Sequence, residues 1–202
     1  MATQATLFDF PADVGLEQDH LGIPGLALYR GLLTTEEQAD ALRYIDAAPW
    51  RDDLKRRVQH YGYKYDYKAR SINREMRVGD LPPFAIDIAQ RMLDRKLIGE
   101  MPDQLIVNEY RPGQGITAHV DCEPCFKNTI VTISLGSVYE MDFIDIESGE
   151  VRSTPLDLGS ALILRDDARY RWMHRIKARK NDGQGPRGRR VSLTYRNVIL
   201  GQ

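Results

Sequence analysis

Four residues that can bind a transition metal lie close together in the segment GITAHVDCEPC, residues 115–125: His119, Asp121, Cys122 and Cys125. His119 and Asp121 are two apart at the end of an expected strand. Alternate side chains of a strand point to the same side, so this imidazole and carboxylate could share one ion. A strand histidine hydrogen-bonded to a nearby aspartate would give the same short pattern. The pair therefore needs a third ligand from elsewhere in the chain.

Among the four histidines, at positions 20, 60, 119 and 174, only His174 has a strand-rich context downstream, in RYRWMHRI. Two histidines and one carboxylate on one face of an octahedron leave three positions open. This arrangement is typical of non-haem Fe(II) sites that react with O₂.

Cys122 and Cys125 form a C-x-x-C, which by itself is compatible with a redox pair or with half of a zinc site. The sequence contains no second C-x-x-C or histidine pair to complete a zinc site. Thiolates on an iron would also take the positions that O₂ and a co-substrate need. We therefore expect two small thiols in the loop beside the site, and not iron ligands.

The C-terminal segment RRVSLTYRNVIL predicts a strand with an unusual polar face. The residues that share this face are Arg190, Ser192, Thr194 and Arg196. A buried guanidinium needs an anionic partner, and a dicarboxylate co-substrate would supply two carboxylates. Asn108 and Tyr110, in VNEY, also share one strand face and offer an amide and a phenol as donors.

The elements that must position these residues follow from periodicity and capping signals. We expect one helix over 34–48, which begins with the capping-box pattern Thr34-x-x-Glu37, and a second over 84–98, just after two prolines. The expected strands cover 26–31, 104–110, 116–120, 128–136, 139–146, 160–165 and 190–200. Two helices and then a run of short antiparallel strands predict a mainly β domain of the α+β class, a sandwich or barrel with an appended helical layer.

The length of 202 residues suits one well-cored domain, which we place at 25–202 after a lead-in segment at 1–24. The net charge of −1 hides two basic segments. Residues 51–79 hold nine Lys/Arg against four acids, and residues 165–190 hold ten against three. Such segments could converge on a polyanion or on small acidic ligands. We see no membrane span and no secretory signal, and two cysteines suit a reducing cytoplasm.

Taken together, these residues make the chain resemble the AlkB family of Fe(II)- and 2-oxoglutarate-dependent dioxygenases over roughly residues 25–200. The matching segments, in the family's order and spacing, are NEYRPGQGITAHVD, TISLGS, ARYRWMHRI and RRVSLTYR. The resemblance implies a double-stranded β-helix (jelly-roll) core with the N-terminal helices packed on one sheet. It also implies an oxidation that uses Fe(II), 2-oxoglutarate and O₂.

The resemblance assigns roles to the polar residues of the expected site. The implied iron ligands are His119, Asp121 and His174. The implied 2-oxoglutarate-binding residues are Arg190 and Tyr110, at the distal carboxylate, and Asn108 and Arg196, at the end that chelates the metal. The family often has Asn where this chain has Ser192, so a weaker or relayed contact is expected there. Glu123 occupies the position where the family commonly places an acid that meets an alkylated base.

The segment RRVQHYGYKYDYKAR, ahead of the expected core, alternates rings and cations. Its tyrosines recur with period two, at Tyr61, Tyr63, Tyr65 and Tyr67. Aromatic faces with interleaved cations suit a splayed base and its phosphates. In AlkB relatives this place is taken by a lid over the nucleotide, so we assign residues 51–79 as a substrate-recognition lid. An amphipathic hairpin with its tyrosines packed inward is the alternative.

These features predict a monomeric enzyme that oxidatively demethylates or hydroxylates a base in DNA or RNA, in a single strand or flipped out of a duplex. An oxygenase that modifies a protein side chain, with the basic lid docking an acidic partner, is the alternative within the same family. A binding module without chemistry is a third possibility, and the complete set of expected ligands argues against it.

Overall fold

The computed structural model describes residues 15–52, 55–66 and 69–200. The strands are β1 (Leu16–Glu17), β2 (Leu26–Tyr29), β3 (Val58–Tyr61), β4 (Gln104–Tyr110), β5 (Ile116–His119), β6 (Ile130–Leu135), β7 (Glu140–Asp145), β8 (Val151–Pro155), β9 (Ala161–Leu164), β10 (Trp172–Ile176), β11 (Asn181–Asp182), β12 (Gly185–Pro186) and β13 (Arg190–Arg196). The α-helices are α1 (Thr35–Ala47), α2 (Pro83–Asp94) and α3 (Asp166–Tyr170), with 3-10 turns at His20–Gly22 and Arg74–Met76.

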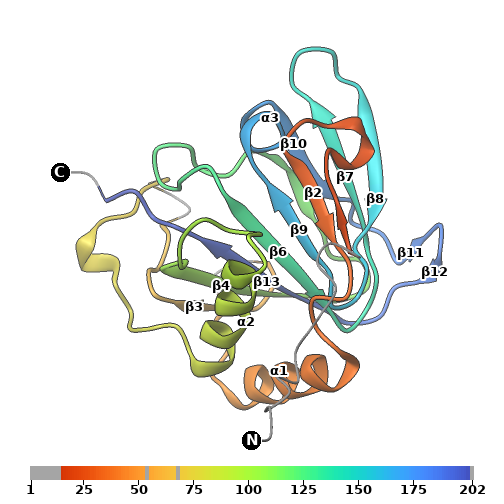
Figure 1. Ribbon diagram of the computed structural model, residues 1–202. Helices are drawn as coiled ribbons and strands as arrows, with labels where there is room; N and C mark the ends of the chain where they lie inside the picture. The colour runs from red at the N-terminus through yellow and green to blue at the C-terminus, as the bar shows by residue number, and fades with distance from the viewer. Residues whose placement is uncertain (1–14, 53–54, 67–68, 201–202) are drawn as a thin grey trace, which may run out of the picture.

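Two antiparallel sheets make up most of the domain (Figure 1). Within the described residues, the large sheet has the order β1-β2-β9-β6-β13-β4-β3, and the small sheet has the order β5-β10-β7-β8. A buried cluster that includes Leu28, Tyr110, Phe143 and Trp172 contains residues from both sheets. The two sheets therefore pack face to face, as expected for a jelly-roll core.

Helices α1 and α2 cover the outer face of the large sheet (Figure 1). Helix α1 begins with the predicted capping box: the Thr34 side chain accepts from the Glu37 amide, and the Glu37 side chain accepts from the Thr34 amide. The apolar residues of both helices join one buried cluster with alternate residues of the central strands. Among the described residues, no helix has the length and apolar character of a membrane-spanning segment.

The alternation of the central strand β13 fixes the two sides of the large sheet. Val191, Leu193 and Tyr195 belong to the cluster under the helices. The residues between them line a pocket on the opposite face, between the sheets: Arg190, Ser192, Thr194 and Arg196. Alternate residues of β13 point to opposite faces of the sheet. Since the apolar residues pack under the helices, the four polar side chains point into the space between the two sheets.

The predicted α+β class and the helices on one sheet are confirmed. Strand β4 has the predicted bounds, whereas α2 ends at Asp94 and not at 98, since the chain turns at Lys96, where φ is 56°. Among the strands of four or more residues, the sequence analysis does not predict β3, β8 or β10. Strands β3 and β8 are each the outermost strand of their sheet within the described residues, and half-exposed strands of this kind carry a weak apolar signal.

A buried carboxylate ties the lid segment to the sheet. Glu109, on β4, is 2% exposed and accepts two hydrogen bonds from Arg57, at 2.8 and 2.7 Å. It also accepts one from Arg189, at 2.7 Å, and Arg189 in turn pairs with Asp46 at the end of α1. Hydrogen bonds from Arg57 and Arg189 lower the pKa of Glu109 to about 2, against the effect of its burial.

We expect Glu109→Gln to lower the free energy of unfolding at pH 7 by roughly 3 kcal/mol, because it breaks a buried ion pair from one side. This value is the lower end of the usual range, since the two arginine partners, Arg57 and Arg189, are each about one-third exposed. The folded pKa lies below the ordinary value of 4.5, so the stabilisation is present above that pH and is lost as the pH falls toward 2. Urea titrations from pH 7 to pH 3 should show a flatter pH dependence in the variant. Equal slopes for both proteins would contradict the role of this carboxylate.

Candidate active site

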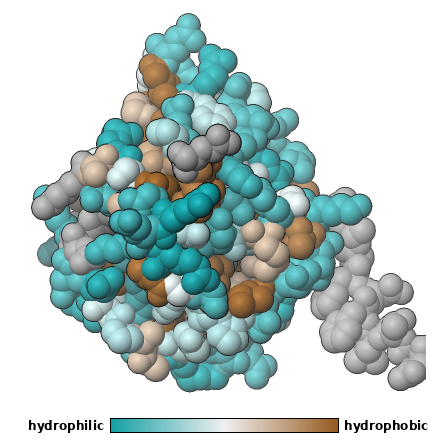
Figure 2. Space-filling view, turned by 90° about the vertical axis from the view of Figure 1, so that its left-hand side faces the viewer, coloured by the Kyte–Doolittle hydropathy of each residue, from teal (hydrophilic) through white to brown (hydrophobic). Residues whose placement is uncertain are grey.

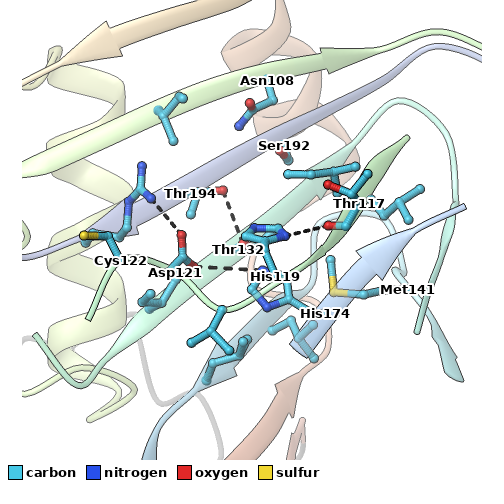
Figure 3. Close-up of a pocket in the computed structure, with 18 of the residues that line it drawn as sticks. Asn108, Thr117, His119, Asp121, Cys122, Thr132, Met141, His174, Ser192 and Thr194 are labelled. Carbon is cyan, nitrogen blue, oxygen red and sulfur yellow. Dashed lines mark hydrogen bonds and ion pairs between the residues drawn. The ribbon is translucent and has the colours of Figure 1, made fainter. Parts of the chain in front are cut away.

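The structure gathers His119, Asp121 and His174 at one end of the pocket between the sheets (Figure 3). His119 is the last residue of β5, and Asp121 follows two residues later in the loop. His174 lies directly opposite His119 in the β5–β10 pair. The two rings have centroids 4.3 Å apart, and Nε2 of His174 lies 3.9 Å from Oδ2 of Asp121. Residues 55 positions apart in the chain thus form one cluster.

Neighbouring groups orient the His119 ring and set the protonation of His174 and Asp121. Nδ1 of His119 donates to the Thr117 carbonyl at 2.8 Å, which leaves the lone pair on Nε2. Burial lowers the pKa of His174 to about 3, so its imidazole is neutral at pH 7. Burial raises the pKa of Asp121, but the charge of Arg196, whose guanidinium donates to Oδ1 at 2.9 Å, holds it at about 2. Neutral imidazole and ionised carboxylate are the forms that ligate metals.

The donor set fits Fe(II) in its chemistry, because two imidazoles and one carboxylate are the facial set of non-haem iron sites. Two atoms that bind side by side at about 2.1 Å from one ion are roughly 3 Å apart. Nε2 of His174 and Oδ2 of Asp121 are farther apart than this, at 3.9 Å. In the described part of the chain, no three His, Cys, Asp or Glu side chains lie close enough together to hold a metal ion as they stand. The three residues share one end of the pocket, and to bind one ion they would have to move closer together.

The other end of the pocket is built to receive an anion. Arg190 is 1% exposed, its Nη2 donates to Ser134 at 2.9 Å, and burial lowers the pKa of Arg190 to about 10, so it stays charged. Among the described residues, Nε of Arg190 is buried and has no hydrogen-bond partner, and neither has Nη2 of Arg196, whose guanidinium lies beside Asp121. Buried charged donors of this kind need acceptors. A pocket of about 380 Å³ beside them leaves room for a small dicarboxylate.

The other predicted 2-oxoglutarate-binding residues line the same pocket. Arg190 is paired with Tyr110, and Ser192 with Asn108, across β13 and β4. The Arg190 guanidinium lies 5.2 Å from the centre of the Tyr110 ring. Figure 3 shows Asn108 and Ser192 along one wall, with His119 and His174 across from them.

Two residues that contact this end of the site, Ser134 and Arg56, were not singled out from the sequence, and of these Arg56 lines the pocket. Ser134, the partner of Arg190, lies in the TISLGS segment. Arg56 lies in the basic segment; it donates to Asn108 at 2.9 Å and lies 5.3 Å from the centre of the Tyr110 ring. Arg56 thus connects the start of the lid segment to the pocket, although only its charge could be read from the sequence.

The tyrosines of the lid segment do not form one face. Tyr65 is 7% exposed, lines the pocket and packs against Phe126 with the two rings tilted and their centroids 5.4 Å apart. Tyr61 packs against the cluster under the helices, and its hydroxyl donates to Gln59. Tyr63 packs beside the Tyr65 cluster, and Tyr67 lies outside the described residues. The alternation ends because β3 ends at Tyr61 and the chain turns at Gly62, where φ is 74° and a Cβ would lie 1.8 Å from the Asp103 carbonyl.

Glu123 is exposed in the loop after Asp121 and is not among the residues that line the pocket. Its predicted role at an alkylated base would require a substrate that reaches out to this loop.

The expectation of two separate thiols is wrong: Cys122 and Cys125 form a disulfide, with Cα atoms 5.2 Å apart. A tight turn brings them together, since the amides of Cys125 and Phe126 both donate to the Cys122 carbonyl. Both sulfurs are buried and lie 3.4 and 3.3 Å from the Arg70 carbonyl of the lid segment. This disulfide lies within the loop that follows Asp121 and is in contact with the lid segment at Arg70.

Two facing sheets around a pocket with two imidazoles, a carboxylate and buried guanidinium groups are features typical of an oxygenase that uses iron and a dicarboxylate. The family model of the 2OG-Fe(II) oxygenase superfamily matches residues 25–196, so the chain belongs to that superfamily. Its enzymes use Fe(II), 2-oxoglutarate and O₂.

The relatives place the chain more narrowly, in the AlkB family. It is 34% identical over 170 residues to the mouse tRNA (carboxymethyluridine(34)-5-O)-methyltransferase ALKBH8, which covers 79% of this chain and 25% of the relative. It is 32% identical over 212 residues to the Arabidopsis thaliana "Alkylated DNA repair protein ALKBH8 homolog", over 92% of this chain and 61% of the relative. The chain thus spans less than two-thirds of either relative. The solved structure of OsALKBH1 shares the fold, with a TM-score of 0.67 at 20% identity over 86% of this chain and 97% of that one.

Proposed function

We propose that this dioxygenase oxidises an alkylated base of a nucleic acid, with His119, Asp121 and His174 as the ligands of Fe(II). One observation carries the proposal: these three side chains share a pocket with two buried guanidinium groups, and each guanidinium has a nitrogen donor without a hydrogen-bond partner among the described residues. A dicarboxylate that chelates the metal at one end and meets Arg190 at the other would satisfy both features.

In this proposal, Fe(II), 2-oxoglutarate and O₂ supply the oxidation of a C–H bond, and an oxidised N-methyl group is lost as formaldehyde. The chain's own residues bind and orient. Arg196 holds the carboxylate of Asp121, and Thr117 holds the ring of His119 with its Nε2 lone pair free. Arg190 and Tyr110 would hold the distal carboxylate of the co-substrate. Asn108, Ser192 and Arg196 would lie along its chelating end.

The substrate class is supported by the relatives and by the lid segment. Two relatives are named for work on tRNA and for the repair of alkylated DNA. Residues 51–79 carry an excess of positive charge beside the pocket, which suits a phosphate backbone. The side of the molecule where the lid segment lies is mainly hydrophilic, with hydrophobic residues in separate patches (Figure 2). Such a surface suits a polar polymer better than an apolar peptide.

The decisive experiment measures succinate and formaldehyde from the purified protein with methylated and unmethylated single-stranded oligonucleotides of DNA and of RNA. We expect succinate above the basal rate with a methylated oligonucleotide, and formaldehyde in equal amount. If acidic proteins stimulate succinate production and none of the oligonucleotides does, the assignment of a nucleic-acid substrate is overturned and a protein side chain is favoured.

We expect Tyr65→Leu to lower activity on a methylated oligonucleotide by tenfold or more. Leucine keeps apolar packing but removes the ring face, and a base stacked on a ring contributes about 1–3 kcal/mol. Basal 2-oxoglutarate turnover without substrate should persist. Tyr61→Leu is the matched control, because Tyr61 belongs to the same repeat but packs under the helices. Equal losses in the two variants, at equal melting temperatures, would contradict a substrate role for Tyr65.

We also propose residues 51–79 as the substrate lid of a single catalytic domain at 25–202, acting as a monomer in the cytoplasm. The contacts of Arg56 with Asn108, and of Tyr65 with Phe126, support the place of the lid over the pocket. Analytical ultracentrifugation with and without an oligonucleotide tests the monomer.

A further inference from the structure

Arg169 is a buried arginine to which the proposed mechanism gives no role. It lies on α3, is 2% exposed, and its guanidinium lies 4.8 Å from the centre of the Tyr170 ring. Its Nη1 donates to the Asp121 carbonyl at 2.9 Å, and its Nη2 donates to the Cys122 carbonyl at 3.3 Å. Both hydrogen bonds therefore go to the backbone of the loop that carries a proposed metal ligand.

A guanidinium in this position needs an explanation. In the part of the chain that the structure describes, Nε of Arg169 has no hydrogen-bond partner and no carboxylate forms a salt bridge with Arg169. Burial of a charge with only carbonyl partners is unfavourable. By contrast, the equally buried Arg187 donates to both oxygens of Asp182 and to two carbonyls. Arg187 has the pairing expected of a structural arginine, and Arg169 does not.

The place of Arg169 in the fold shows what it holds. Strands β5 and β10 bring His119 and His174 together as a pair, and β5 ends at this point. Asp121 lies beyond the last pair, where no strand pairing fixes the chain. Helix α3 leads directly into β10, so Arg169 is five residues before His174. Its guanidinium thus ties the Asp121 loop to the segment that carries the second histidine.

We propose that Arg169 is a positioning residue for the metal site, which fixes the backbone at 121–122 so that the Asp121 carboxylate faces the two imidazoles. This inference rests on the proposed metal ligands. Arg196 and Arg169 have complementary roles, because Arg196 orients the carboxylate from the side of β13 and Arg169 holds the main chain behind it. Loss of a group that orients a metal ligand typically weakens metal affinity by about 10–100-fold.

The test measures Mn(II) binding to the metal-free protein, from the electron paramagnetic resonance signal of free Mn(II). We expect Arg169→Gln to weaken Mn(II) binding by about 10–100-fold. Arg169→Lys should weaken it less, because lysine keeps the positive charge but cannot donate to both carbonyls as the guanidinium does. The control is Arg187→Gln, which removes an equally buried arginine and breaks an ion pair. It should lower the melting temperature at least as much and leave Mn(II) affinity unchanged.

Wild-type affinity in a folded Arg169→Gln protein would overturn the inference. So would an equal loss in Arg187→Gln, because the effect would then be general destabilisation. If Arg169→Gln does not fold, Arg169→Lys decides: affinity equal to that of the wild type counts against the role, and a loss at unchanged melting temperature supports it. Failure of the proposed metal site itself looks different, since the wild type would then bind Mn(II) no better than His174→Ala.

Discussion

Replacement of His174 with alanine is expected to abolish 2-oxoglutarate turnover and to leave the fold largely intact. The loss should be roughly a thousandfold or more, because removal of one member of a catalytic unit costs about as much as removal of the whole unit. The side chain is 13% exposed and faces the pocket, so the sheets do not depend on it for packing. Succinate production and circular dichroism measure the two effects.

His20→Ala is the matched control for this prediction. His20 is also largely buried, but it hydrogen-bonds Glu17 and Thr154 and is not among the residues of the pocket. We expect His20→Ala to lower the melting temperature and to keep turnover within a fewfold of the wild type. Full activity in His174→Ala would refute the proposed ligand set.

Arg190→Ala should raise the concentration of 2-oxoglutarate needed for half-maximal turnover by roughly 10²–10³-fold. The reason is that removal of one partner from a buried charge pair costs roughly 3–5 kcal/mol, and the Arg190 side chain is enclosed beside Tyr110 and Ser134. Arg190→Lys should restore only part of the affinity, because an ammonium cannot bind a carboxylate through two parallel donors. Titration of 2-oxoglutarate into the Mn(II)-loaded protein gives the affinity directly.

Arg189→Ala is the informative comparison. Arg189 precedes Arg190 in the chain, but its guanidinium points to the opposite face of the sheet, to Glu109 and Asp46. We expect its loss to lower stability and not the affinity for 2-oxoglutarate. The same affinity in Arg190→Ala as in Arg189→Ala would rule out Arg190 as the anchor of the distal carboxylate.

Sequence patterns predicted those parts of the site that depend on regular strands. The alternation of Arg190, Ser192, Thr194 and Arg196 places them in the pocket because β13 is a regular strand over its whole length. The same rule failed for the tyrosines of the lid segment, since the strand ends at Tyr61, the chain turns at Gly62, and Tyr63 and Tyr65 lie in a loop.

Other features depend on contacts that leave no mark in the sequence. The hydrogen bonds of Arg169 go to backbone carbonyls, which every residue has, so no partner residue could reveal them. The pairing of Cys122 with Cys125 depends on a local turn, and the low cysteine content favoured the opposite expectation. The buried role of Glu109 depends on arginines that are far apart in the chain.

The two ends of the pocket lie on parts of the fold that should open at different rates. The anion-binding end lies on β13, which is hydrogen-bonded on both sides, to β4 and β6. The proposed iron-binding end includes β5, which, among the described residues, pairs only with β10 at the edge of the small sheet. Amide hydrogen exchange should therefore be slowest at 190–196, where it requires global unfolding, and faster at 116–121, where local unfolding is enough. The protein would then unfold locally at the proposed ligands His119 and Asp121 while the proposed binding site of the co-substrate on β13 is still folded.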